Sequence, residues 1–233
     1  MRRLGWRSYH EIRLPIGEVN KILDESGAEP WFKWSIAARA SRGEATSAMQ
    51  WIVDNMSRDA VVFETGCGCG ANLIWLGQKK FRNLSGIDKS QSAIAAAEDL
   101  AGLAGLPITF RQDDGLQPIH MVADVDCLLA LNWVYYSPAF DLNHFLSQYR
   151  NALKPDGVIV MDMVDRAFDK YPRNGYLTDD WHLPPERQRP TQYKIRMTRD
   201  EIAAAAHSAG FEVSAFLSGT EIPPRFVTVL KRC

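Results

Sequence analysis

Three glycines at alternate positions form the stretch of the sequence best suited to hold a ligand. Gly66, Gly68 and Gly70 follow a short apolar run whose last residue is the acid Glu64. Glycine reaches positive φ angles and lets a ligand approach the main chain, and a helix after such a turn offers unpaired N–H groups. The pattern indicates a binding loop. Alone it is a weak signal, because with Ala71 it also satisfies the glycine fingerprint of dinucleotide-binding folds.

The charge of Glu64 distinguishes between two nucleoside cofactors. A nicotinamide dinucleotide would bring its pyrophosphate onto the turn, where Glu64, two residues before the first glycine, would repel it. S-adenosylmethionine carries an ammonium and a sulfonium instead of phosphates, so the same acid would attract it. Glu64 therefore favours a cationic cofactor.

Two more acids follow the next two expected strands. Asp88 ends the strand expected at 83–88, where a carboxylate can accept hydrogen bonds from both ribose hydroxyls of either cofactor. Asp114 follows the strand expected at 108–112 and is placed to reach the adenine edge, where it can accept from the exocyclic amine. Three acids thus follow three successive strands.

The elements that must position these residues alternate along the chain from about residue 60. Short apolar, β-branched runs alternate with helical patterns, which is typical of βα units on a parallel sheet. Strands are expected at 60–64, 83–88, 108–112, 126–132 and 157–163, and covering helices at 72–81, 90–105 and 142–154.

The C-terminal part adds a helix and a hairpin. A capping box of Thr198 and Glu201 predicts a helix that ends at Gly210, where a left-handed C-cap is favoured. The strands expected at 211–217 and 226–232 are joined by a link too short for a crossover helix, so they should pair antiparallel.

The first part of the chain differs in pattern from the rest. Residues 1–57 lack strand patterning and carry helix-compatible stretches at 16–26 and 44–56. We therefore expect an N-terminal helical extension or cap over 1–57 and one domain over 58–233.

Composition limits the class of protein and the class of partner. A chain of 233 residues, 46% hydrophobic and 24% charged, is ordinary for one sizeable globular core. A net charge of −1 gives no general attraction to nucleic acid or to an anionic membrane. No apolar run approaches the roughly 18 residues that span a bilayer, and no signal-peptide pattern opens the chain. We expect a cytoplasmic protein that acts on a small molecule without membrane contact, and leave a homo-oligomer open.

The four cysteines give no metal pattern. Cys67, Cys69, Cys127 and Cys233 form neither a CxxC pair nor a set with zinc spacing, so we expect no metal site and no disulfide framework. Cys67 and Cys69 could be soft-metal ligands, but small side chains that fill a glycine turn are the more ordinary interpretation.

Taken together, residues 60–233 resemble the class I S-adenosylmethionine-dependent methyltransferases. The resemblance lies in the order and spacing of five segments: the acidic glycine loop, the ribose-binding strand end, the adenine-binding acid loop, the turn into the fifth strand, and the last helix with the sixth strand. These are residues 62–73, 84–90, 110–116, 151–162 and 196–213.

The resemblance implies a fold and a cofactor. The fold is a Rossmann-like α/β sheet of seven mostly parallel strands in the order 3-2-1-4-5-7-6, with only strand 7 antiparallel and helices on both faces. The cofactor is S-adenosyl-L-methionine, with S-adenosyl-L-homocysteine as product. The implied contacts are Glu64 with the methionine ammonium, Gly66, Gly68 and Gly70 with the amino-acid end, Asp88 with the ribose, Asp114 with the adenine, and Leu131 and Asn132 with the methionine part.

Aromatic residues follow the expected fourth strand. Methyl transfer from a sulfonium is an in-line displacement that needs alignment, exclusion of water and, for some acceptors, removal of a proton. Aromatic faces attract a sulfonium and pack a substrate, and Trp133, Tyr135 and Tyr136 are placed for this. One or two of them could equally be core residues.

Residues 163–196 form a long insertion before the last helix. A stretch of this length without regular structure is often a lid or a binding loop. Its aromatic and basic side chains could stack on a ring and hold an anion. These are Tyr171, Tyr176, Trp181, His182 and Tyr193, with Arg173, Arg187, Arg189 and Arg196. We expect acceptor contacts at Trp133, Tyr135, Tyr136, Tyr176, Trp181, Arg187 and Arg189.

Two residues are candidates for a general base. The ordinary pKa of histidine suits proton removal near neutral pH, and His182 lies among the aromatic residues of the insertion. A surface or packing histidine is the alternative. Asp162, at the end of the fifth expected strand, is the second candidate.

Three functions agree with these features to different degrees. The first is methylation of a small polar acceptor, anionic acceptors included, such as a hydroxyl of a sugar, sugar nucleotide or phosphorylated metabolite. The second is nucleic-acid methylation, since residues 132–135 distantly resemble the N/DPPY signature of amino-group methyltransferases but lack both prolines. The third is a non-catalytic binding module with this fold, against which the intact cofactor acids argue.

Overall fold

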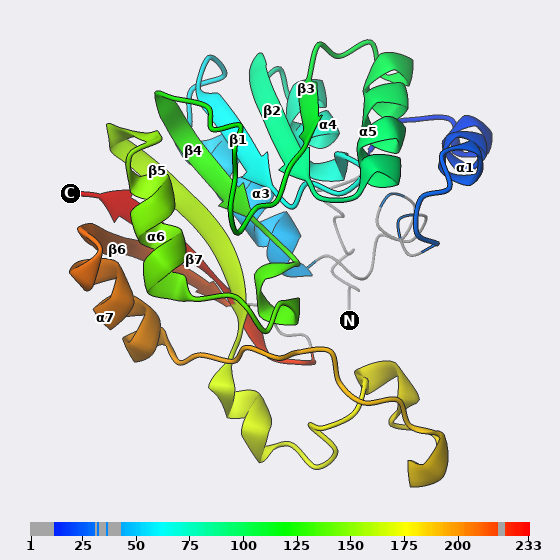
Figure 1. Ribbon diagram of the computed structural model, residues 1–233, viewed down its shortest axis with the longest axis vertical. Coiled ribbons are helices and arrows are strands. Elements are labelled where there is room, and N and C mark those ends of the chain that lie inside the picture. The colour runs from blue at the N-terminus through cyan, green and yellow to red at the C-terminus, as the bar shows by residue number, and fades with distance from the viewer. Residues whose placement is uncertain (1–11, 31, 33–35, 37–42, 219–221) are drawn as a thin grey trace, which may run out of the picture. The chain divides into compact units, whose positions relative to one another are not determined.

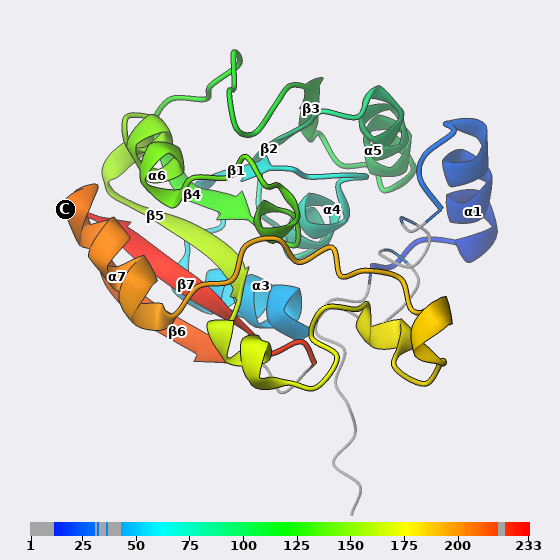
Figure 2. The same ribbon diagram turned by 60° about the horizontal axis from the view of Figure 1, so that its bottom comes forward.

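The computed structural model describes residues 12–30, 32, 36, 43–218 and 222–233 (Figures 1 and 2). Seven strands form one sheet in the order β3-β2-β1-β4-β5-β7-β6, which confirms the expected order. Only β7 runs antiparallel to its neighbours β5 and β6. The strands are β1 (Val61–Thr65), β2 (Asn83–Asp88), β3 (Thr109–Gln112), β4 (Val125–Ala130), β5 (Leu153–Val164), β6 (Phe211–Ser218) and β7 (Arg225–Arg232).

The chain divides by its contacts into two compact units, Met1–His120 and Met121–Cys233. The expected division into a helical extension over 1–57 and a domain over 58–233 stays a prediction. Among the residues that the structure describes, no helix has the length and apolar character that a membrane span requires.

In the first unit, β1, β2 and β3 pair in parallel and are accompanied by four labelled helices. Helix α4 is buried over nearly its whole length, since its eight residues are mostly apolar. Helix α1 packs against α5 (Figures 1 and 2). All four lie where the sequence pattern predicts them: α1 (Ile16–Glu25), α3 (Gly43–Asn55), α4 (Ala71–Gln78) and α5 (Gln91–Leu103).

In the second unit, β4 to β7 are accompanied by α6 (Leu142–Arg150) and α7 (Arg199–Ser208), which pack together. The capping box of Thr198 and Glu201 is present, and Gly210 has φ +76° beyond the end of α7, as expected.

Helix α6 is shorter than its sequence pattern predicts. It was expected to reach residue 154 but ends at Arg150, because Leu153 is already buried and paired with Val125 of β4. Pro155 also lacks the N–H that a continuing helix needs.

The insertion is built of short 3₁₀ helices rather than a structureless loop. The two ends of the insertion are joined by a β-bridge between Asp165 and Met197. The Met197 N–H also donates a hydrogen bond to the Val164 carbonyl at 3.0 Å. Phe168 is fully buried and stacks on Trp181 with ring centroids 6.1 Å apart. The insertion therefore has an aromatic core of its own. Its 3₁₀ helices are η2 (Arg166–Lys170), η3 (Thr178–Asp180) and η4 (Pro185–Arg187), and η1 (Val134–Tyr136) precedes them after β4.

Candidate functional site

The glycine loop between β1 and α4 has the backbone that its sequence predicts. Gly66, Gly68 and Gly70 have φ angles of +66°, +53° and +75°, a region that costs other residues about 1–2 kcal/mol. Space is tight as well. A Cβ at Gly68 would lie 2.6 Å from the Phe32 ring, and one at Gly70 would lie 2.6 Å from the Phe110 ring. Both the backbone angle and the lack of space thus require glycine at positions 68 and 70.

Asp88 joins the end of β2 to the glycine loop. Its Oδ2 accepts a hydrogen bond from the Gly68 N–H at 2.9 Å, and its Oδ1 accepts from the Ser90 N–H at 2.9 Å. The side chain is only half-buried, so the carboxylate fixes the loop while part of it faces outward. The structure brings these two sequence-predicted features together.

Glu64 lies at the end of β1 with 1% of its surface exposed. Its Oε1 accepts a hydrogen bond from Asn72 Nδ2 at 2.5 Å, and Asn72 is in the first turn of α4. Burying a carboxylate costs free energy unless hydrogen bonds compensate it, and the bond from Asn72 does so for Oε1. Sequence reasoning missed Asn72. Its signal was a single polar side chain in an otherwise apolar helix start.

The cysteines of the loop are packing residues. Cys67 and Cys69 are buried free thiols. Burial raises the pKa of Cys67 well above its ordinary value, and the negative charges of Glu64 and Asp88 raise it further, so the thiol stays protonated. The described residues contain no group of three or more His, Cys, Asp or Glu placed to hold a metal ion.

Gly86 in β2 is a further residue that sequence reasoning missed. A Cβ there would lie 2.9 Å from the Cβ of Cys67 and 2.8 Å from the Leu73 side chain. The loop can therefore lie directly on β2 only because position 86 has no side chain. A glycine inside a strand was the available signal.

Two adjacent acids after β3 have different environments. Asp114 is exposed, and its Oδ1 accepts a hydrogen bond from the Leu116 N–H at 2.8 Å. Asp113 is buried, and its Oδ2 accepts the N–H groups of Ile119 at 2.9 Å and His120 at 2.6 Å. Burial alone would raise the pKa of Asp113, but these backbone hydrogen bonds outweigh it and lower the pKa. Asp113, which sequence reasoning missed, fixes the loop that carries Asp114.

In the second unit, a polar cluster forms at the ends of β4 and β5 and the start of β7. Asp162 is fully buried, and its Oδ1 accepts the Asn132 N–H at 2.7 Å. Arg225 Nη1 donates to Asn132 Oδ1 at 2.9 Å and lies 2.5 Å from the Tyr135 hydroxyl oxygen. It also lies 3.3 Å from Asp162 Oδ2. Sequence reasoning missed Arg225, because only the strand register brings it to this place. Leu131, next to the cluster, is buried.

The aromatic residues after β4 divide between core and surface. Tyr135 is fully buried, and burial and the charge of Asp162 raise its pKa. Trp133 is half-buried against the edge of Phe145. Tyr136 is 41% exposed and stacks on Tyr193 with ring centroids 5.6 Å apart. Tyr136 is therefore the best placed of the three to meet a ligand.

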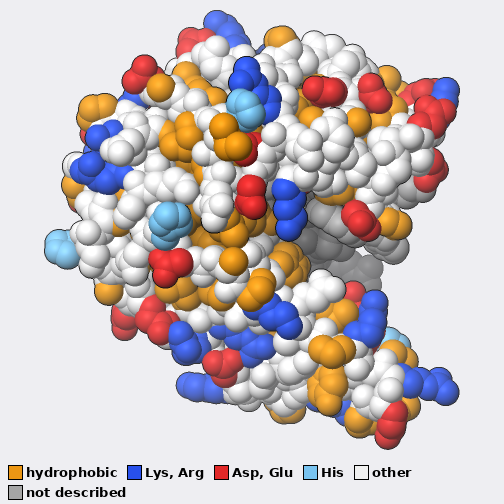
Figure 3. Space-filling model, in the orientation of Figure 1, with side chains coloured by type: hydrophobic (Ala, Val, Ile, Leu, Met, Phe, Trp, Pro, Cys, Tyr) orange, Lys and Arg blue, Asp and Glu red, His pale blue; other side chains and the backbone are white. Residues whose placement is uncertain are grey.

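The basic residues of the insertion are not equivalent. Arg189 forms a two-pronged ion pair with Asp180, with both N–O distances 2.8 Å, which lowers the pKa of Asp180 to about 2. Arg187 is exposed, and so is His182. Figure 3 shows basic side chains next to acidic and hydrophobic ones over the insertion, at the bottom of the view. Arg187 is thus freer than Arg189 to meet an anion.

The remaining predicted acceptor residues belong to the packing of the insertion. Tyr176 is half-buried and bridges to Pro190 across the loop. Trp181 Nε1 donates to the Arg173 carbonyl at 3.1 Å, while its ring stacks on Phe168. Each presents only part of its side chain to solvent.

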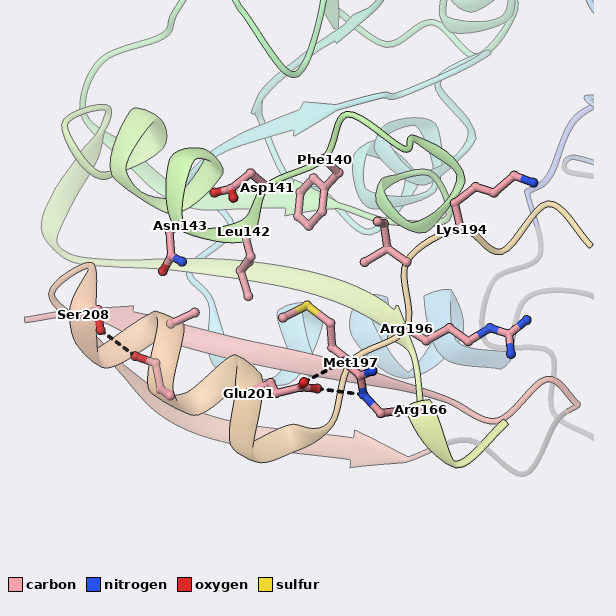
Figure 4. Close-up of a pocket in the computed structure, with 13 residues that line it drawn as sticks. Phe140, Asp141, Leu142, Asn143, Arg166, Lys194, Arg196, Met197, Glu201 and Ser208 are labelled. Atoms are coloured by element: carbon pink, nitrogen blue, oxygen red, sulfur yellow. Dashed lines mark hydrogen bonds and ion pairs between the residues drawn. The ribbon is translucent and has the colours of Figure 1, made fainter. Parts of the chain in front are cut away.

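A groove of about 630 Å³ lies in the second unit between α6, α7 and residues 194–197 (Figure 4). One wall carries the ion pair of Arg166 and Glu201, with an N–O distance of 2.6 Å. Arg196, one of the basic residues of the insertion named above, lines this groove, but none of the residues expected to contact the cofactor or the acceptor does.

A family model described as a methyltransferase domain matches residues 62–157, which include the glycine loop and the three acids Glu64, Asp88 and Asp114. No curated protein matches the sequence significantly.

Solved structures with a similar fold are numerous. An S-adenosylmethionine-dependent methyltransferase from Methanosarcina mazei is 18% identical with a TM-score of 0.63, over 78% of this chain and 96% of that one. Magnesium protoporphyrin IX methyltransferase from Synechocystis PCC 6803, solved with S-adenosylhomocysteine, is 15% identical with a TM-score of 0.64, over 93% and 94%. The Burkholderia thailandensis 1,6-didemethyltoxoflavin-N1-methyltransferase is 14% identical with a TM-score of 0.64, over 94% and 91%. At these identities the likeness shows a shared fold.

Proposed function

We propose that this chain is an S-adenosylmethionine-dependent methyltransferase that methylates a small polar acceptor, anionic in part. The match of residues 62–157 to a methyltransferase domain and the strand order of the sheet support this. One observation carries most of the proposal. The Gly68 N–H of the glycine loop donates to Asp88, and a buried acid, Glu64, is the last residue but one of the strand before the loop. A loop of positive-φ glycines with acids around it suits a cationic nucleoside cofactor.

The cofactor-binding roles follow from the family's pattern. Glu64 would attract the methionine ammonium, Asp88 would accept from the ribose hydroxyls, and Asp114 would accept from the adenine amine. Exposure of Asp114 and partial exposure of Asp88 support these roles. Gly66, Gly68 and Gly70 would contact the amino-acid end, and Leu131 and Asn132 the methionine part.

S-adenosylmethionine supplies an activated methyl group, and the acceptor-side residues supply alignment. Tyr136 would stack on the acceptor or face the sulfonium, with Trp133 and Tyr135 behind it. His182 would remove a proton where the acceptor needs it, which its exposure allows. Tyr176, Trp181 and Arg189 would shape the acceptor side of the insertion.

Substitution of Arg187 tests the proposal that the acceptor carries a negative charge. We expect Arg187→Ala to raise the KM for an anionic acceptor roughly 10- to 100-fold with little change in kcat, since hydrogen bonds to charged groups contribute about 1.5–3 kcal/mol. The measurement is release of S-adenosylhomocysteine across a panel of sugar phosphates, sugar nucleotides and neutral sugars.

Lys170→Ala is the matched control, because Lys170 is another exposed cation of the insertion. If Arg187→Ala and Lys170→Ala leave the acceptor KM equally unchanged, the anionic part of the proposal is wrong.

Nucleic-acid methylation is the second candidate. It rests only on the distant resemblance of residues 132–135 to the N/DPPY signature. The net charge of −1 gives no general attraction to nucleic acid that would support it. Salt-dependent binding of single-stranded RNA or DNA would favour it.

Binding of the cofactor without turnover of any acceptor would favour a non-catalytic module. That the protein is cytoplasmic and that it forms a homo-oligomer are proposals that rest on the sequence.

A further inference from the structure

The backbone of Asn132 has an unusual conformation at the end of β4. Its φ is +64°, which is uncommon for a residue other than glycine. Such conformations persist where the surrounding structure holds them. Here Asp162 Oδ1 accepts the Asn132 N–H at 2.7 Å, and Arg225 donates to the Asn132 side chain at 2.9 Å. Asn132 is therefore held at its main chain and at its side chain.

Arg225 and Asp162 reach Asn132 because of the register of β5 and β7. Asp162 pairs with Val227 and Val164 pairs with Arg225, so Asp162 and Arg225 are diagonal neighbours across two antiparallel strands. The Arg225 side chain is 10% exposed and that of Asp162 is 0% exposed. A buried ion pair is weak evidence for a role in stability, because well-packed apolar residues are often at least as favourable. What this pair achieves specifically is to hold Asn132 and the Tyr135 hydroxyl.

We propose that Arg225 and Asp162 are positioning residues that hold Asn132 in its left-handed conformation for binding of the cofactor. This rests on the proposed function, in which Asn132 contacts the methionine part. It also gives Asp162 a role other than general base, since both of its carboxylate oxygens face hydrogen-bond donors within the cluster.

Strands β4 and β5 carry a control ion pair at their other ends. Lys154 of β5 bonds both carboxylate oxygens of Asp126 of β4 at 2.8 Å. Asp126→Asn therefore weakens an ion pair between β4 and β5 without touching Asn132. Asp162→Asn makes the same chemical change beside Asn132.

The test is titration of S-adenosyl-L-homocysteine into the full-length protein by calorimetry, with melting temperatures recorded for each variant. We expect Arg225→Gln, Asp162→Asn and Asn132→Ala each to weaken binding roughly 10-fold, the lower end for a lost hydrogen bond to a charged group. Asp126→Asn should change the affinity less than about twofold, whatever its effect on the melting temperature.

The double variant Arg225→Gln with Asn132→Ala separates positioning from a general loss of stability. Two residues that act through one contact give non-additive effects, so the double variant should bind about as well as either single variant. Losses that multiply to roughly 100-fold would overturn the proposal, and so would unchanged affinity in Asn132→Ala. If the unaltered protein does not bind S-adenosylhomocysteine, the proposed function itself is wrong. If it binds and all variants bind equally, only the positioning role is wrong.

Discussion

Gly70→Ala is expected to destabilise the protein by about 2–5 kcal/mol. The left-handed backbone of Gly70, with φ +75°, costs an alanine about 1–2 kcal/mol. The new Cβ would lie 2.6 Å from Phe110 Cζ and 3.2 Å from the Cβ of Ala97, and overpacking of this kind typically costs about 1–3 kcal/mol. For a chain of this length, thermal unfolding should show the melting temperature fall by roughly 5–15 °C.

Gly105→Ala is the control that separates backbone strain from crowding. Gly105 has φ +65°, but a Cβ there would meet nothing within 4 Å. Gly105→Ala should therefore lower the free energy of unfolding only by the backbone strain, about 1–2 kcal/mol. Equal destabilisation by Gly70→Ala and Gly105→Ala would contradict the view that the Phe110 ring packs onto the loop so closely that only glycine fits.

Asp88→Ala is expected to weaken binding of S-adenosylhomocysteine by at least about 10- to 100-fold. The substitution removes the acceptor of the Gly68 N–H and the proposed acceptor of the ribose hydroxyls together, and a hydrogen bond to a charged group contributes about 1.5–3 kcal/mol. Asp88→Asn keeps one acceptor oxygen and should bind with intermediate affinity. Calorimetric titration measures both.

Asp99→Ala serves as the comparison, because Asp99 is an exposed acid on the neighbouring helix α5. It should bind S-adenosylhomocysteine as the unaltered protein does. Should Asp88→Ala also bind normally, the ribose role of Asp88 and its hold on the glycine loop would both be wrong.

The part of the site that sequence could predict is local in the chain. Glycines at alternate positions determine the loop backbone, and the positive φ angles of Gly66, Gly68 and Gly70 are confirmed. The alternation of apolar runs and helical patterns predicted the strands, because it depends on residues that are close in sequence. The order of the strands in the sheet was implied by the family resemblance alone.

The part that sequence could not predict depends on strand register and on burial. Arg225 meets Asn132 across 93 residues of sequence, which no local pattern reveals. Asp113 and Asp114 look alike in sequence, but only the path of the following loop buries Asp113. Tyr135 and Tyr136 are likewise adjacent, and the turn of η1 alone decides that one is core and the other exposed.

The insertion shows the same limit on a larger scale. Its mixture of aromatic and basic residues predicts a binding loop, but Phe168 and Trp181 stack within it and Arg189 pairs with Asp180. Some of the side chains that could hold an acceptor therefore hold the insertion together. Sequence composition does not distinguish these two uses, because both employ the same residue types.

The most direct test of the central claim is a side-by-side titration of the full-length protein with S-adenosylmethionine and with a nicotinamide dinucleotide. The buried carboxylate of Glu64 before the glycine loop predicts saturable binding of S-adenosylmethionine and no binding of the dinucleotide. Binding of the dinucleotide, or failure to bind S-adenosylmethionine, would contradict the account.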